Sequence, residues 1–215
     1  MIDIDRFSMP MAYCSTSLLY PEDLRRLSTK EFLPRPNLAP VDYVQAVFDV
    51  GIKAWEASEE CQRLRSVLET TRLPKITKVI AFANSTMAVA GSSCSRSSQQ
   101  HALMLTMRDI ANRRRTTGQP EVRCFAQDPM YSEADEQVLQ KAGVTVLGDP
   151  RGFLEVDDET VVLSFCPNIP VRQIIADIAR PAVMIWSRIR PEAEDLAIWK
   201  KKEPDRDPSE MYSAL

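Results

Sequence analysis

From residue 41 to about residue 190, short apolar segments alternate with segments whose apolar residues recur at helical spacing. The short segments have the length and β-branched content of buried strands, and they cover residues 76–83, 121–126, 144–147, 160–165 and 182–186. Helical spacing follows at residues 97–115, 132–142 and 171–179. Strands that alternate with helices form a mostly parallel sheet covered on both faces. The pattern therefore predicts a Rossmann-like α/β three-layer sandwich with five strands or slightly more.

Two further helices are predicted ahead of the first strand. Apolar residues recur at helical spacing over residues 41–55, and Ser58 is suited to begin a second helix that Pro74 stops. Gly51 lies in the middle of the first helix, where glycine costs about 1 kcal/mol relative to alanine. We interpret both segments as amphipathic helices that pack on the sheet.

The sequence divides into three parts. Residues 1–40 contain five prolines, which remove backbone donors and favour extended backbone, so they predict a Pro-rich arm with one short helix at 21–27. We interpret this arm as loosely docked, and a lid or partner-binding arm is the alternative. Residues 41–190 are predicted to form a single α/β domain. Residues 191–215 are predicted to be a C-terminal tail with a short amphipathic piece at 193–199.

Composition and charge narrow the class of protein. Hydrophobic residues make up 44% of the chain and charged residues 27%, as in soluble globular proteins, and no apolar run is long enough to span a bilayer. A net charge of -3 argues against bulk nucleic-acid binding. Five widely spaced cysteines without a CxxC pair predict reduced thiols and a cytoplasmic or nuclear protein. Because the chain has a single histidine, no metal site is predicted.

In parallel sheets, ligands bind beyond the carboxyl ends of the strands, at the point where strand order reverses. This rule brings together the loops that follow the strands predicted at 76–83, 121–126 and 160–165. The first loop leads through small and polar residues to a helix N-terminus, whose free N–H groups and dipole suit a polar or anionic group. The candidate ligand-binding residues in these loops are Asn84, Ser85, Ser97, Gln100, Asp128, Pro129, Tyr131, Pro167 and Asn168.

No residue pattern predicts a catalytic centre, so whether the chain is an enzyme stays open. Asp128 ends the second strand, where nucleotide-binding folds hold a ribose hydroxyl, but the GxGxxG fingerprint is absent. We interpret His101 as a structural histidine rather than a general base, and Cys94 as a plain loop thiol rather than an activated one. Cys166-Pro167 resembles the Cys-Pro pair of haem-responsive proteins. Haem and a nucleotide-like ligand are therefore the cofactor alternatives.

Several segments taken together resemble the sensitivity-to-red-light-reduced (SRR) domain family, and within it the fungal branch. The resemblance spans about residues 75–190 and rests on the order and spacing of the segments, which are KVIAFANSTM, SRSSQQHAL, FAQDPMYSEADEQVL, KAGVTVL and VVLSFCPNIPVRQIIADIARPAVMIW. The resemblance implies a regulatory rather than a catalytic role. Members of the family are implicated in light and circadian signalling in plants, in stress and cytoskeletal phenotypes in yeast, and in haem homeostasis in animals.

The sequence departs from the family pattern in two loops. Ala83-Asn84-Ser85 stands where members commonly have a glycine-rich loop. Pro167-Asn168-Ile169 stands where many members have a Pro-His-Cys motif, so chemistry that uses this histidine or cysteine is not expected here.

Two hypotheses of function follow. In the first, an SRR-like regulatory or interaction protein, acting in signalling or in the regulation of stress or development, binds a protein partner, a small molecule or both in the polar cleft. In the second, a transferase-type enzyme binds a nucleotide or S-adenosylmethionine there, with Asp128 holding the ribose and with Asn84 and Asn168 orienting the substrate. The lost glycines and the resemblance favour the first. Whether the chain forms a homodimer stays open.

Overall fold

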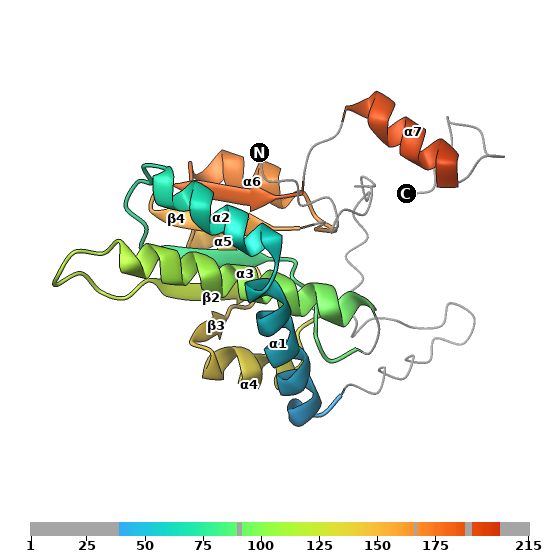
Figure 1. Cartoon of the computed structure of the whole chain (residues 1–215), viewed down its shortest axis with the longest axis horizontal. Coiled ribbons are helices and arrows are strands. Elements are labelled where there is room, and N and C mark those ends of the chain that lie inside the picture. Colours follow the sequence, from blue (N-terminus) through green and yellow to red (C-terminus); the bar gives the residue numbers. More distant parts are fainter. Residues whose placement is uncertain (1–38, 90–91, 166, 188–190, 203–215) are drawn as a thin grey trace.

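The computed structural model describes residues 39–89, 92–165, 167–187 and 191–202. Within these residues, helices and strands alternate as the sequence pattern indicates (Figure 1). Their order is α1 (Val41–Glu56), α2 (Glu59–Thr70), β1 (Lys78–Phe82), α3 (Ser92–Arg113), β2 (Arg123–Gln127), α4 (Glu133–Lys141), β3 (Val144–Val146), α5 (Arg151–Leu154), β4 (Thr160–Ser164), α6 (Val171–Ile178), β5 (Val183–Trp186) and α7 (Glu192–Lys202).

The five strands form one all-parallel sheet in the order β3-β2-β1-β4-β5. The prediction of a Rossmann-like α/β fold is confirmed. Strand order reverses between β1 and β4, because the chain adds β2 and β3 on one side of β1 and then returns to its other side. This reversal is the point at which ligands bind in such sheets. At the carboxyl ends of the two strands on either side of this reversal, Phe82 of β1 lies opposite Ser164 of β4.

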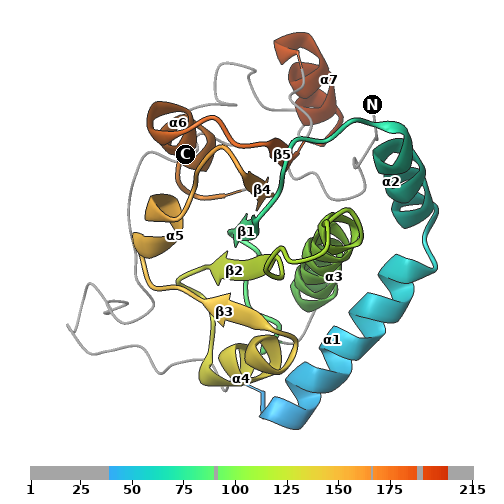
Figure 2. The same cartoon turned by 90° about the vertical axis from the view of Figure 1, so that its left-hand side faces the viewer.

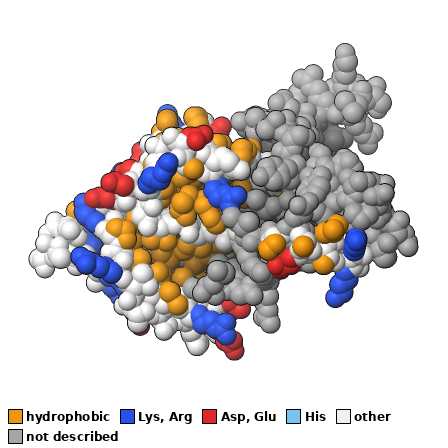
Figure 3. All heavy atoms as spheres, turned by 90° about the horizontal axis from the view of Figure 1, so that it is seen from above, with side chains coloured by type: hydrophobic (Ala, Val, Ile, Leu, Met, Phe, Trp, Pro, Cys, Tyr) orange, Lys and Arg blue, Asp and Glu red, His pale blue; other side chains and the backbone are white. Residues whose placement is uncertain are grey.

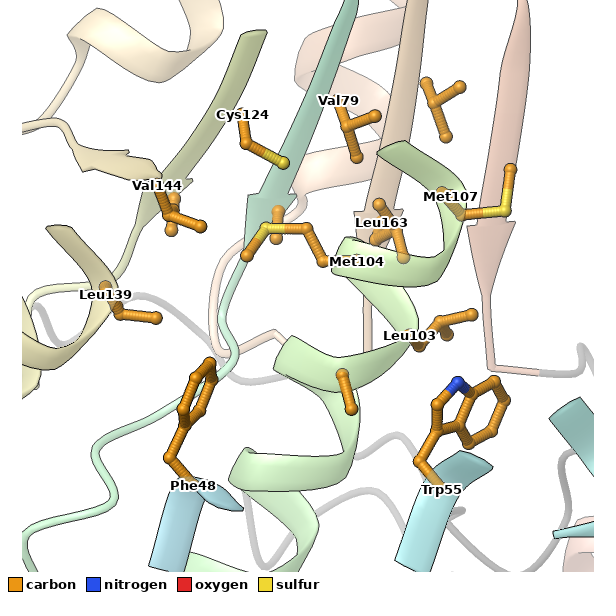
Figure 4. Close-up of a cluster of buried hydrophobic side chains, with 14 of the residues drawn as sticks. Phe48, Trp55, Val79, Leu103, Met104, Met107, Cys124, Leu139, Val144 and Leu163 are labelled. Atoms are coloured by element: carbon orange, nitrogen blue, oxygen red, sulfur yellow. The ribbon is translucent and has the colours of Figure 1, made fainter. Parts of the chain in front are cut away.

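Helices cover both faces of the sheet, with α1 to α4 on one face and α5 and α6 on the other (Figure 2). The larger core lies under α3, whose Leu103, Met104 and Met107 lie between the sheet and the side chains of Phe48 and Trp55 from α1 (Figure 4). The indole N–H of Trp55 donates a hydrogen bond of 2.9 Å to a buried threonine hydroxyl on α3. The layer of helices on this face is therefore two deep, with α1 packed outside α3.

The crossing of α1 over α3 depends on Gly51. A Cβ atom at this position would lie 2.2 Å from Ser98 Oγ and 2.4 Å from Ser98 Cβ. These distances are far below van der Waals contact, so the two helices approach each other closely only because residue 51 has no side chain. Gly51 therefore has a packing role that offsets its low helix propensity.

β5 forms an edge of the sheet, and its four side chains are only partly buried. Seen from this side of the molecule, hydrophobic side chains gather in a patch between charged ones (Figure 3). No helix among the described residues is long and apolar enough to cross a membrane.

Two expectations about local structure were wrong. Gly148, Pro150 and Gly152 predict a turn, but residues 151–154 form the short helix α5, because Gly152 N–H donates to the Gln127 side chain at 2.6 Å and Phe153 stacks on Phe82. Helix α3 begins at Ser92 rather than near Ser97, because serine-rich sequence gives a weak helix signal. Predictions for the arm at 1–38, for Cys166 and for residues 203–215 fall outside the described residues.

Candidate functional site

The loop after β1 has an unusual backbone. Ala83 and Ser85 both adopt left-handed conformations, with φ of 59° and 62°. Residues other than glycine pay about 1–2 kcal/mol for this conformation, and it persists only where the surrounding structure holds it. The glycines expected in this loop from the resemblance are replaced, yet the backbone still adopts a conformation that suits glycine.

A closed ring of hydrogen bonds holds this loop. Ser85 N–H donates to Asp128 Oδ2 at 2.7 Å, and Ser97 Oγ donates to the Ser85 carbonyl at 2.8 Å. His101 Nδ1 lies 2.7 Å from the Ser97 carbonyl, and its Nε2 lies 2.8 Å from the Tyr131 hydroxyl. Tyr131 N–H closes the ring on the Asp128 carbonyl at 3.3 Å. The ring ties the loop to Ser97 and His101 of α3 and to the loop after β2.

The ring fixes the protonation of His101 and Tyr131. Because a carbonyl only accepts hydrogen bonds, Nδ1 carries the proton and Nε2 accepts from the Tyr131 O–H. Burial lowers the pKa of His101 to about 4, against the opposing effects of the Ser97 carbonyl and the Asp135 charge. Burial, together with the Asp128 and Asp135 charges, raises the pKa of Tyr131 well above 10. Both side chains are neutral at pH 7, and His101 is a structural residue.

This buried histidine is expected to make stability fall in mild acid. Its pKa is lower in the folded than in the unfolded chain, so below pH 6.5 protons favour unfolding. The free energy of unfolding should fall by about 2 kcal/mol between pH 7 and pH 5, and His101→Gln should remove most of this slope. Because the chain has one histidine, its ring signal in a proton NMR titration reports the pKa directly. A midpoint near 6.5 would contradict the assignment.

Asp135 fixes the other end of the same loop. Its fully buried carboxylate accepts from Thr86 Oγ1 at 2.5 Å and from Met87 N–H at 2.8 Å. It also accepts from the backbone and the hydroxyl of Ser132, at 2.8 and 2.7 Å, in a capping box at the start of α4. The positive end of the α4 dipole favours the negative charge there. The β1 loop is therefore held from two sides.

Immediately before these two supports in the chain lies Asn84, whose side chain has no partner among the described residues. It is 1% exposed, and within the part of the chain that the structure describes neither Oδ1 nor Nδ2 forms a hydrogen bond. Ser164, at the end of the neighbouring strand β4, is also 1% exposed, and its hydroxyl has no hydrogen-bond partner in residues 39–89, 92–165, 167–187 and 191–202. A buried polar group without a partner costs about 1–3 kcal/mol. The strained loop and the two unpaired groups coincide at the reversal of strand order.

The structure brings together only some of the candidate residues predicted from the sequence. Ser85, Ser97, Asp128 and Tyr131 belong to the hydrogen-bonded ring, which adjoins Asn84. The other candidates are partly buried or exposed, and they are Gln100, Pro129, Pro167 and Asn168. The side-chain amides of Gln100 and Asn168 form no hydrogen bond to a described residue.

Asp128 stabilises the loop after β1 in this structure. Its Oδ1 accepts from Met130 N–H at 2.8 Å while Oδ2 accepts from Ser85 N–H, so both oxygens already have backbone donors. Burial raises the pKa of this carboxyl, and the two backbone donors oppose the rise. Nothing in this arrangement favours a ribose hydroxyl as its partner.

Sequence reasoning missed two residues of this region. Asp135 carried a signal, because Ser132 and Asp135 have the spacing of a capping box. Ser164 also carried one, since it is a polar residue that ends an otherwise apolar strand. Elsewhere, burial raises the pKa of the Cys124 thiol to about 12, which disfavours its thiolate form.

The chain matches the model of a known protein family. A family model described as the SRR1 domain matches residues 60–211, which include the whole sheet and the loops described above. A search of curated proteins found no match.

Proposed function

Because this chain belongs to the SRR1 domain family, we propose that it is a regulatory protein that binds a small ligand at the carboxyl ends of β1 and β4. We assign it to signalling or to the regulation of stress or development, in the cytoplasm or nucleus, and to the fungal branch of the family. Ligand binding at this edge would then control which protein partners the chain engages.

The unpaired Asn84 amide is the observation that carries this proposal. The groups around it are paired, since Ser85 N–H, Met87 N–H, Ala88 N–H and the Ser85 carbonyl all have hydrogen-bond partners, and two networks hold the backbone in a strained conformation. Strain and unpaired groups persist where function requires them, because selection for stability alone would remove them. A ligand that presents an acceptor and a donor to the amide would supply the two absent hydrogen bonds.

The same geometry favours binding over catalysis. His101 is held neutral with both ring nitrogens engaged, and the Asp128 oxygens already accept backbone hydrogen bonds. No acid–base pair in the described residues is free for proton transfer beside Asn84. No specific observation favours the transferase hypothesis.

Native mass spectrometry of the full chain tests the proposal. Because Asn84 is almost fully buried, a bound ligand would be enclosed and released slowly, so it should survive purification. The freshly purified wild type should carry an extra mass that denaturation releases, and Asn84→Ala should lose most of this mass. The matched control, Gln137→Ala, removes an exposed amide and should keep it. A bare wild-type mass, or an extra mass retained by Asn84→Ala, would contradict the proposal.

A further inference from the structure

Helix α6 begins at the same edge of the sheet with free backbone donors. Its N-cap residue, Pro170, offers no side-chain hydrogen bond, and no acidic residue lies in the first turn. Val171 N–H donates to the Ile169 carbonyl, whereas the N–H groups of Arg172 and Gln173 have no acceptor among the described residues. The helix dipole adds a partial positive charge at this point.

Arg172 places a full positive charge in the first turn of α6, where the helix dipole disfavours positive charge. Its guanidinium carbon lies 5.9 Å from the centre of the Trp186 ring, at the end of β5, and both side chains are partly exposed. No carboxylate in the described part of the chain forms an ion pair with it. A cation in the first turn of a helix opposes the dipole, so its position there calls for an anionic partner.

The unpaired Ser164 hydroxyl points to the same place. Side chains alternate along β4, so Ser164 shares a face with Val162, which packs with Val171 and Ile175 of α6. In the sheet, Ser164 lies opposite Trp186 on β5. The hydroxyl is therefore directed to the α6 side of the sheet, below the start of that helix, and it is 1% exposed without a partner.

We infer that the start of α6 binds a phosphate group of the ligand. The Arg172 guanidinium, the N–H groups of Arg172 and Gln173, and the Ser164 hydroxyl supply donors to several oxygens of one tetrahedral anion. Arginine binds phosphate through two parallel N–H groups, and helix N-termini bind it through backbone donors. The inference rests on the proposed function, since the phosphate would belong to the ligand that enters at this edge.

Titration of the full chain with inorganic phosphate tests the inference. Tryptophan fluorescence and melting temperature should both change with phosphate at constant ionic strength, because the anion binds the folded chain beside Trp186. Arg172→Gln should weaken the phosphate affinity at least tenfold. Ser164→Ala should weaken it at least threefold without lowering stability in the absence of phosphate, since it removes an unpaired hydroxyl. Arg180→Gln, beyond the other end of α6, is the matched control and should leave the affinity unchanged.

The outcomes separate this inference from the proposed function. No response to phosphate, an affinity unchanged in Arg172→Gln or in Ser164→Ala, or an equal affinity for acetate would overturn the phosphate site. If native mass spectrometry still finds a ligand that Asn84→Ala loses, the proposed function stands and the ligand carries no phosphate at α6. If phosphate binds as expected but no ligand mass is found, the proposed function fails on its own test.

Discussion

Replacing Asp135 by alanine is expected to lower the free energy of unfolding by about 4 kcal/mol. The carboxylate accepts four hydrogen bonds, and its removal leaves the buried N–H groups of Met87 and Ser132 without an acceptor. The loss also releases the β1 loop from the start of α4. Urea unfolding followed by circular dichroism measures the change.

The matched control is Glu136→Ala, in the same turn of α4. Glu136 is exposed, so its removal should change the free energy of unfolding by less than about 0.5 kcal/mol. Equal stabilities of the two variants would show that Asp135 does not hold the loop.

Gly51→Ala is expected to lower the free energy of unfolding by about 2–3 kcal/mol. The added methyl group would overlap Ser98, including its backbone carbonyl carbon at 2.9 Å, so α1 and α3 would have to move apart. The sign is the reverse of what helix propensity alone predicts for this change. Thermal or chemical unfolding of the purified variant measures it.

Two variants control for this prediction. Gly148→Ala meets no atom within 4 Å and should be neutral or slightly stabilising. Ser98→Gly should recover part of the stability lost in Gly51→Ala, because it removes the atoms that the new methyl group overlaps. A Gly51→Ala variant as stable as the wild type would mean that the helices do not cross as closely as described.

The fold could be predicted from the sequence because its signals are local. Each strand is a short apolar run, and the helices between them show helical spacing, so element type and order follow from residues close together in the chain. The exception depends on contacts between residues far apart in the chain. The stretch 151–154 is too short for a periodic signal, and its helix depends on contacts with Gln127 and Phe82 from other strands.

The sequence predicts where the candidate site lies, but it does not predict which polar groups of the site are hydrogen-bonded. The strand-order rule located the loop at Asn84 and the acidic residue at Asp128. The rule could not show that both carboxylate oxygens of Asp128 already accept backbone hydrogen bonds, whereas the Asn84 side chain has no hydrogen-bond partner among the described residues. Hydrogen-bond satisfaction depends on which groups meet in three dimensions, as does the close approach at Gly51. The role of Arg172 was likewise hidden, because its partner ring lies on a different strand.

The central claim is that the Asn84 amide is kept unpaired for a ligand, and the stability of the ligand-free Asn84→Ala variant tests it most directly. Both proteins would be unfolded, dialysed to remove small molecules, refolded and compared in urea. Burying an unpaired amide costs more than alanine loses in packing, so the variant should be more stable than the wild type by about 1 kcal/mol. A variant less stable by a similar amount would show that the amide is already paired within the chain, and the account of the site would be wrong.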